Sequence, residues 1–148
     1  MGTNYKGTRQ EVIALNSFIK LIRCAESLTS RLHPILTEAG LTESQFSILD
    51  AVNQIGPLSQ KELGKKLLKS GGNITMVIDN LERRGFVRRE KNVADRRFFT
   101  IYLTGEGRSV IEKTFPTVLK AVVEEMKVLT DEEHLLLQHS CKILGKKS

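Results

Sequence analysis

The spacing of apolar residues changes its period at Gly85. Before this glycine, apolar side chains recur every three or four residues, a spacing typical of amphipathic helices. After it, residues 86–91 and 98–103 are rich in aromatic and β-branched side chains, and the polar segment 92–97 separates them. Two short strands around a polar loop form a hairpin. The helical period returns after Thr104, so the chain is predicted to be mainly α with a small β wing (α+β).

Six helices are expected from the apolar spacing. The first covers about residues 11–39, and Pro34 within it predicts a kink or a restart near Leu32. The others are expected at about 42–54, 59–68, 70–84, 104–126 and 131–144. No internal repeat interrupts this order, so residues 1–148 are predicted to form a single domain.

Residues that favour helix ends mark several of these boundaries. A Ser or Thr precedes Gln or Glu by three residues, the spacing of a capping box, at Thr42, Ser59 and Thr130. Ser70 is the expected N-cap of the fourth helix. Gly85 is the expected left-handed end of the same helix, because glycine adopts positive φ without steric cost.

The formal net charge of +6 is concentrated in the middle of the chain. Residues 57–108 contain twelve Lys or Arg and six Asp or Glu, whereas the segments on either side are balanced. A basic region between neutral flanks indicates a surface for a polyanion, although charge alone would also fit an ordinary solvated face. The choice between these two interpretations depends on which elements carry the charge.

Three helices followed by a basic hairpin have the element order of a winged helix-turn-helix. An α-helix fits the major groove of DNA, where the base edges distinguish every pair. Asn73 can pair with adenine there, and the methyl groups of Thr75 and Met76 can contact thymine. Gly71 and Gly72 allow the backbone to approach a phosphate at the helix N-terminus.

The predicted hairpin supplies a second contact with DNA. Arg96 and Arg97 lie at its tip, where an arginine can enter a minor groove. The candidate DNA-binding residues are Ser70, Gly72, Asn73, Thr75, Met76, Arg83, Arg88, Asp95, Arg96 and Arg97. Seven other basic residues of the region are phosphate contacts or bystanders: Lys61, Lys65, Lys66, Lys69, Arg84, Arg89 and Lys91.

The wing and the helices before it resemble the MarR family of bacterial regulators. The family's wing pattern, D-x-R followed by a strand and L-T-x-x-G, is matched by Asp95, Arg97, Leu103, Thr104 and Gly107. Residues 63–67 and 74–85 resemble its helix-turn-helix, and the similarity extends over about residues 41–107.

The resemblance implies a winged helix-turn-helix over residues 41–107, with dimerisation helices over 9–39 and 108–146. It also implies a homodimer that binds a palindromic double-stranded DNA operator, typically as a ligand-responsive repressor. Asp95 would orient Arg97, and an unidentified small-molecule effector would bind near the dimerisation helices. The sequence does not choose between repression and activation.

No enzymatic activity, cofactor or metal site is expected. The sequence lacks GxSxG, HExxH and phosphate-loop motifs. His134 and His139 are five residues apart and so lie on different faces of one helix. Cys24 and Cys141 lie in no CxxC motif, and we expect buried free thiols, with a redox role for Cys24 less favoured.

A membrane partner is not expected either. No segment approaches the ~18 consecutive apolar residues of a spanning helix, and residues 1–6 lack the apolar run of a secretory signal. A cytoplasmic protein is therefore the expectation.

Two other binding functions compete with DNA recognition. A winged helix that contacts only other proteins is the main alternative, although many such modules lack a basic wing. RNA binding is less favoured, because the expected stacking aromatics on an open sheet are missing. Affinity that falls steeply with salt would indicate DNA rather than protein as the partner.

Overall fold

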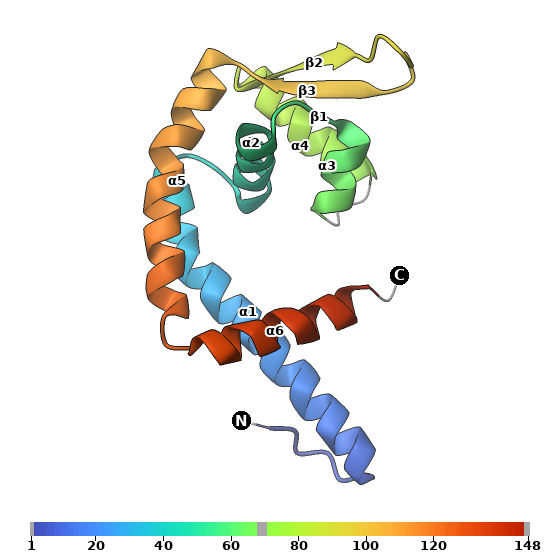
Figure 1. Cartoon of the computed structure of the whole chain (residues 1–148), viewed down its shortest axis with the longest axis vertical. Helices are drawn as coiled ribbons and strands as arrows, with labels where there is room; N and C mark the ends of the chain where they lie inside the picture. Colours follow the sequence, from blue (N-terminus) through green and yellow to red (C-terminus); the bar gives the residue numbers. More distant parts are fainter. Residues whose placement is uncertain (1, 68–70, 147–148) are drawn as a thin grey trace.

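The computed structural model describes residues 2–67 and 71–146 (Figure 1). Over these residues the chain forms α1 (Arg9–Glu38), α2 (Glu43–Ile55), β1 (Leu58–Ser59), α3 (Gln60–Lys66), α4 (Gly71–Arg83), β2 (Val87–Lys91), β3 (Phe99–Leu103), α5 (Gly105–Met126) and α6 (Asp131–Gly145). The mainly helical fold with a small β wing is therefore confirmed. None of the described helices combines the length and apolarity needed to cross a membrane.

The sheet has three antiparallel strands in the order β1-β3-β2. Only the β2–β3 hairpin is expected from the sequence, so the prediction of two strands is incomplete. In the added strand, Leu58 is buried opposite Ile101. A strand of two residues is too short to show the alternation by which strands are recognised.

Capping interactions begin most of the helices. The predicted capping boxes at Thr42, Ser59 and Thr130 are confirmed, and Thr8 with Glu11 forms a further one that begins α1. Gly85 has φ 77°, as its predicted left-handed conformation requires. α1 passes through Pro34 as a single helix, so the expected restart near Leu32 does not occur.

The hydrophobic core lies between α2, α4 and the sheet. Its buried side chains come from every element between α2 and α5 and include Leu49, Leu63, Ile78, Ile101 and Ile111. Ile111 belongs to the first half of α5, so this helix anchors the winged unit to the rest of the chain. The unit from α2 to β3 closes its core without α6 or the N-terminal half of α1.

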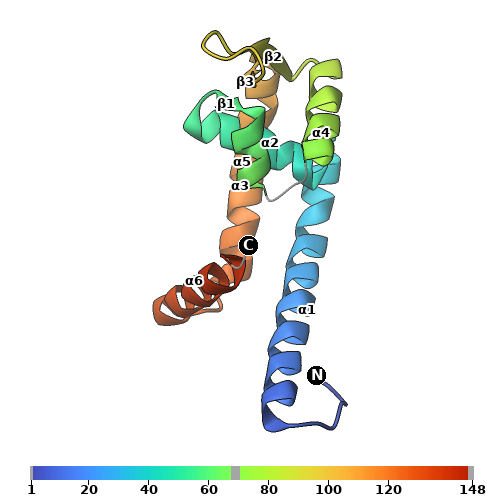
Figure 2. The ribbon, with the colours of Figure 1, turned by 90° about the vertical axis from the view of Figure 1, so that its right-hand side faces the viewer.

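The long helices extend away from this unit. α6 crosses α1 in the view of Figure 1, but the rotated view of Figure 2 separates the two helices. Large apolar side chains on both are consequently exposed, Phe18 by 63% and Leu136 by 67%. Cys24 and Cys141 are exposed as well, so the expectation of buried thiols is wrong for the single chain.

Candidate nucleic-acid interface

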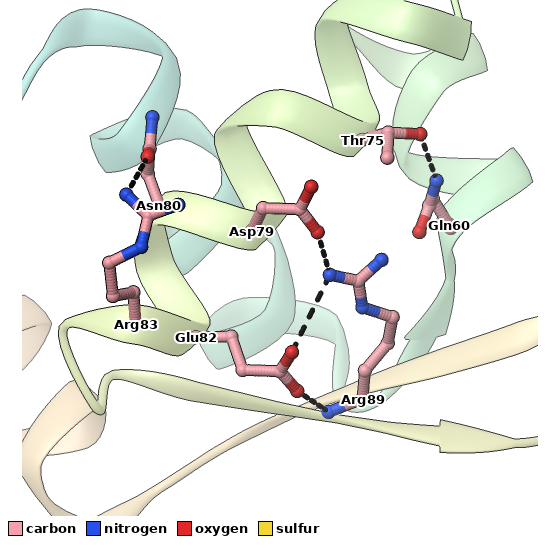
Figure 3. A network of polar contacts seen from close by, with 7 residues as sticks. All are labelled: Gln60, Thr75, Asp79, Asn80, Glu82, Arg83 and Arg89. Atoms are coloured by element: carbon pink, nitrogen blue, oxygen red, sulfur yellow. Dashed lines mark hydrogen bonds and ion pairs between the residues drawn. The ribbon is translucent and has the colours of Figure 1, made fainter.

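Helix α4 presents three chemically different faces. Residues three or four apart share one face of a helix. Ile74, Ile78 and Leu81 are buried in the core. A second face carries Thr75, Asp79 and Glu82, which bind groups of α3 and β2 (Figure 3). The third face is the most exposed and carries Asn73, Met76, Asn80 and Arg83.

The residues predicted to read bases are therefore divided between two faces. Asn73 is exposed, and Met76 is 58% exposed on the same face. Thr75 lies on the neighbouring face and is half-buried, and its Oγ1 accepts a hydrogen bond of 2.7 Å from Gln60 Nε2 (Figure 3). Gln60 is the first residue of α3, so this bond connects the two helices of the motif.

The beginning of α4 is described only in part. Gly72 lies in its first turn, after Gly71. Ser70, the predicted N-cap, and Lys69, a candidate phosphate contact, lie outside the described residues. At the other end of the helix, Arg83 is exposed and donates a 2.9 Å hydrogen bond from Nη1 to Asn80 Oδ1. These two side chains extend the exposed face by two turns beyond Asn73 and Met76.

Asp95 and Arg97 form a two-point ion pair at the wing tip. Arg97 Nε lies 3.0 Å from Asp95 Oδ1, and Arg97 Nη2 lies 2.7 Å from Asp95 Oδ2. The backbone N–H of Arg97 also donates to Oδ1, at 3.1 Å. Hydrogen bonds from Arg97 hold the pKa of the Asp95 carboxyl below its ordinary value. Arg97 is nevertheless 85% exposed, so its guanidinium is oriented without being buried.

Arg96 and Arg88 complete the predicted wing residues. Arg96 is exposed, and its side chain makes no ion pair or hydrogen bond within residues 2–67 and 71–146. Arg88 is also exposed, donates 3.0 Å from Nε to Glu90 Oε1 on its own strand, and stacks over Tyr102 at 4.7 Å. Both arginines remain accessible from outside the molecule.

Two of the arginines expected to be phosphate contacts or bystanders bind other groups of the protein. Arg84 Nη1 donates to the Gly40 carbonyl at 2.7 Å and to Gln45 Oε1 at 3.2 Å. Arg89 binds the Asp79 and Glu82 carboxylates of α4. Their partners lie on other elements, so no local spacing in the sequence distinguishes these arginines from their exposed neighbours.

Within the described part of the chain, no three His, Cys, Asp or Glu side chains gather closely enough to hold a metal ion. The exposed face of α4 and the wing tip carry amides, a thioether and guanidinium groups. These are donors and apolar contacts suited to base edges and phosphates.

Comparisons with known proteins agree with this geometry. A model of the MarR family matches residues 41–98. The chain is 31% identical over 116 residues to the HTH-type transcriptional regulator YcgE of Bacillus subtilis, covering 78% of this chain and 75% of YcgE.

Solved structures extend the likeness to the whole chain. NadR in complex with 4-hydroxyphenylacetate has a TM-score of 0.76 and 28% identity, with all of both chains covered. A mutant MarR from E. coli complexed with operator DNA has a TM-score of 0.70 and 27% identity, over 87% of this chain and 96% of that one. The chain belongs to the MarR family of transcriptional regulators, which bind DNA and are not enzymes.

Proposed function

We propose that this protein is a repressor that binds a palindromic operator as a homodimer and releases it in response to a small molecule. The observation that carries the DNA-binding part is the exposed face of α4, with Asn73, Met76, Asn80 and Arg83, beside a wing tip that carries Arg96 and Arg97. Both belong to residues 57–108, where the entire positive excess lies.

Each element has its own role in this proposal. Asn73, Thr75 and Met76 contact base edges in the major groove, with Ser70 and Gly72 against the phosphate at the start of α4. Arg83 and Arg88 contact phosphates, which fixes the register without reading sequence. Asp95 holds the guanidinium of Arg97, and Arg96 or Arg97 enters the minor groove beside it.

A second copy of the chain is the proposed cover for the apolar surface of α1, α5 and α6. These helices expose large apolar side chains that a monomer would leave in water: Ile13, Phe18, Ile22, Leu119, Val123, Leu135, Leu136, Ile143 and Leu144. A two-fold pairing through them would set two α4 helices about 34 Å apart, one turn of DNA. The operator is then an imperfect palindrome.

A pocket between α1 and α5 is the proposed effector site. Its volume is about 450 Å³, within the range of small-molecule sites. The pocket is lined by apolar Ile35 and Val110, by the hydroxyl residue Thr117, and by the oppositely charged Glu38 and Lys113. This lining suits a small aromatic acid whose carboxylate binds Lys113, and NadR is known in complex with such a compound, 4-hydroxyphenylacetate.

Arg84 offers a path from this pocket to the recognition helix. Glu38 and Ala39 line the pocket at the end of α1, and Gly40 follows directly with φ 74°. The Gly40 carbonyl accepts the hydrogen bond from Arg84, the residue after the end of α4. A ligand that displaces the end of α1 therefore pulls on α4, which supports a ligand-dependent loss of DNA affinity.

Selection from random duplexes with the purified protein tests the DNA-binding proposal. We expect a consensus with two inverted half-sites and an affinity that falls steeply between about 50 and 200 mM salt. Transcription in vitro from a promoter that carries this consensus is expected to fall when the protein is added. Enrichment of no duplex, or a salt-independent affinity, would contradict the proposal and favour a protein partner.

Titration with 4-hydroxyphenylacetate as the first probe tests the ligand response. We expect the probe to lower affinity for the consensus duplex, and Lys113→Met to weaken probe binding by about tenfold, as for loss of one charge-assisted contact. Arg84→Gln is expected to preserve probe binding while reducing its effect on DNA affinity, because coupling and binding are separate free energies. Equal coupling in the wild type and in Arg84→Gln would reject this path.

A further inference from the structure

Arg89 joins the wing to the recognition helix at three points. Its backbone N–H donates to Glu82 Oε2 at 3.0 Å, its Nη2 lies 3.5 Å from Glu82 Oε1, and the same Nη2 pairs with Asp79 Oδ1 (Figure 3). Asp79 and Glu82 are three residues apart, so one side chain of β2 spans almost a full turn of α4. The two elements proposed to enter DNA are thus connected directly.

Comparison with the neighbouring Arg88 shows that Arg89 is poorly placed to contact phosphate. Arg88 points to the opposite face of the strand, and its side chain is 54% exposed. The Arg89 side chain is only 16% exposed and faces two carboxylates. One guanidinium against two carboxylates leaves no surplus positive charge, so Arg89 has little attraction to offer a phosphate.

A guanidinium is well suited to fix a relative orientation. Its planar fork binds carboxylates in defined directions, and charge-assisted hydrogen bonds are stronger than neutral ones. Because the Arg89 side chain is little exposed, water competes less for the hydrogen bonds of its guanidinium. Gln60 holds the same face of α4 one turn earlier through Thr75, so the face is anchored at both ends and the exposed face is turned outward.

We propose that Arg89 is a positioning residue for operator recognition and makes no contact with DNA itself. By holding Asp79 and Glu82, it sets the angle between α4 and the β2–β3 wing. A duplex can then meet α4 in its major groove and the wing tip in the adjacent minor groove at the same time. This inference rests on the proposed DNA-binding function and assigns a role within it to residues outside the exposed face.

Asp79→Asn gives the sharpest test, because two explanations predict opposite signs. If Arg89 contacts phosphate, removal of a nearby negative charge strengthens DNA binding. If Arg89 positions α4 through Asp79, the same change weakens binding to the selected consensus, whereas binding to a scrambled duplex is kept, since phosphate contacts need no fixed orientation. The measured quantity is the ratio of the two affinities, by fluorescence anisotropy.

We expect Arg89→Gln and Asp79→Asn each to lower this ratio by about tenfold, equivalent to about 1.4 kcal/mol. The double variant is expected to be no worse than Arg89→Gln alone, because that change already removes the contact with Asp79. Arg89→Lys keeps the positive charge but loses the forked guanidinium, so it is expected to lower the ratio less. It replaces Arg89→Gln in this test if Arg89→Gln reduces the melting temperature.

Arg88→Gln is the matched control, one residue away on the same strand. Because Arg88 is a proposed phosphate contact, Arg88→Gln should weaken binding to both duplexes alike and reduce the slope of affinity against salt by about one. Arg89→Gln is expected to leave this slope unchanged. An unchanged or raised ratio in Asp79→Asn, or a salt slope reduced in Arg89→Gln, would overturn the positioning role alone. A wild-type protein with no duplex preference would overturn the proposed function as well.

Discussion

Arg96 and Arg97 are adjacent, but only Arg97 is held by a carboxylate. The Asp95 pair partly neutralises Arg97 and leaves it oriented, whereas Arg96 has no ion-pair partner among residues 2–67 and 71–146. We therefore predict that Arg96→Ala weakens binding to the consensus and scrambled duplexes equally and reduces the slope of affinity against salt by about one. The measurement is anisotropy over a salt series, with the exposed Lys120→Ala on α5 as control. Equal slopes in both variants would exclude a phosphate contact by Arg96.

The wing ion pair also makes a prediction about pH. Because hydrogen bonds from Arg97 lower the pKa of Asp95 below its ordinary value in the folded protein, the pair contributes stability above the ordinary pKa and loses it as pH falls through the lowered one. Wing geometry should therefore be constant between about pH 5 and pH 8. We expect the carboxyl carbon of Asp95 to titrate below its ordinary midpoint in NMR spectra. Arg97→Gln should raise the Asp95 midpoint toward its ordinary value. An ordinary midpoint in the wild type would show that the ion pair does not form in solution.

At the scale of elements, the start of α5 packs against the backbone that enters the wing. A methyl group built on Gly107 would lie 1.9 Å from the Phe86 carbonyl oxygen. Backbone cannot rotate aside as a side chain can, so we predict that Gly107→Ala destabilises the fold by about 1–3 kcal/mol, as overpacking does. Thermal and urea unfolding measure this change.

Gly105 provides the matched control in the same turn of α5. A methyl group there would meet nothing within 4 Å. Because alanine has the higher helix propensity, Gly105→Ala is expected to preserve or slightly raise stability. Similar losses in the two variants would mean that the cost arises from α5 itself and not from its contact with Phe86.

Elements were predictable where their signals are local. Capping boxes such as Thr42 with Gln45 and the left-handed Gly85 depend on neighbours within a few residues, and the structure has them as expected. The two-residue β1 gives no such signal, because its pairing with β3 joins residues more than forty positions apart. The same reason hides Arg84, whose acceptor Gly40 is 44 positions away.

The candidate site was predictable in its chemistry more than in its geometry. Residue types alone identify amides and methyl groups on α4 and arginines on the wing as suited to DNA. They do not reveal that Thr75 faces Gln60, or that Arg89 faces Asp79 while Arg88 faces outward. Which basic residues remain available is decided by tertiary contacts.

At the scale of the whole molecule, the winged unit and the exposed apolar surface of the helices lie at opposite ends. The winged unit has a closed core, whereas α6 and the N-terminal half of α1 lie away from it (Figure 2). Both of these helical segments expose large apolar side chains. An extended helix of this kind gains little stability from its own chain, because helical stability in proteins comes mostly from packing. The proposed dimer would supply that packing and would also set the spacing of the two α4 helices.

Leu136→Glu tests this connection between assembly and recognition. Leu136 is 67% exposed in the single chain, so a glutamate there leaves the winged unit intact, but a buried unpaired charge at a dimer interface is costly. We predict a dimer dissociation constant raised by at least about thirtyfold, or about 2 kcal/mol, in sedimentation experiments. Operator affinity should fall with it, because each chain would then bind one half-site alone. Ile55→Glu, at a 57% exposed position on α2, introduces the same charge outside the proposed interface and should remain dimeric. If Leu136→Glu sediments like Ile55→Glu, then α6 does not form the dimer interface.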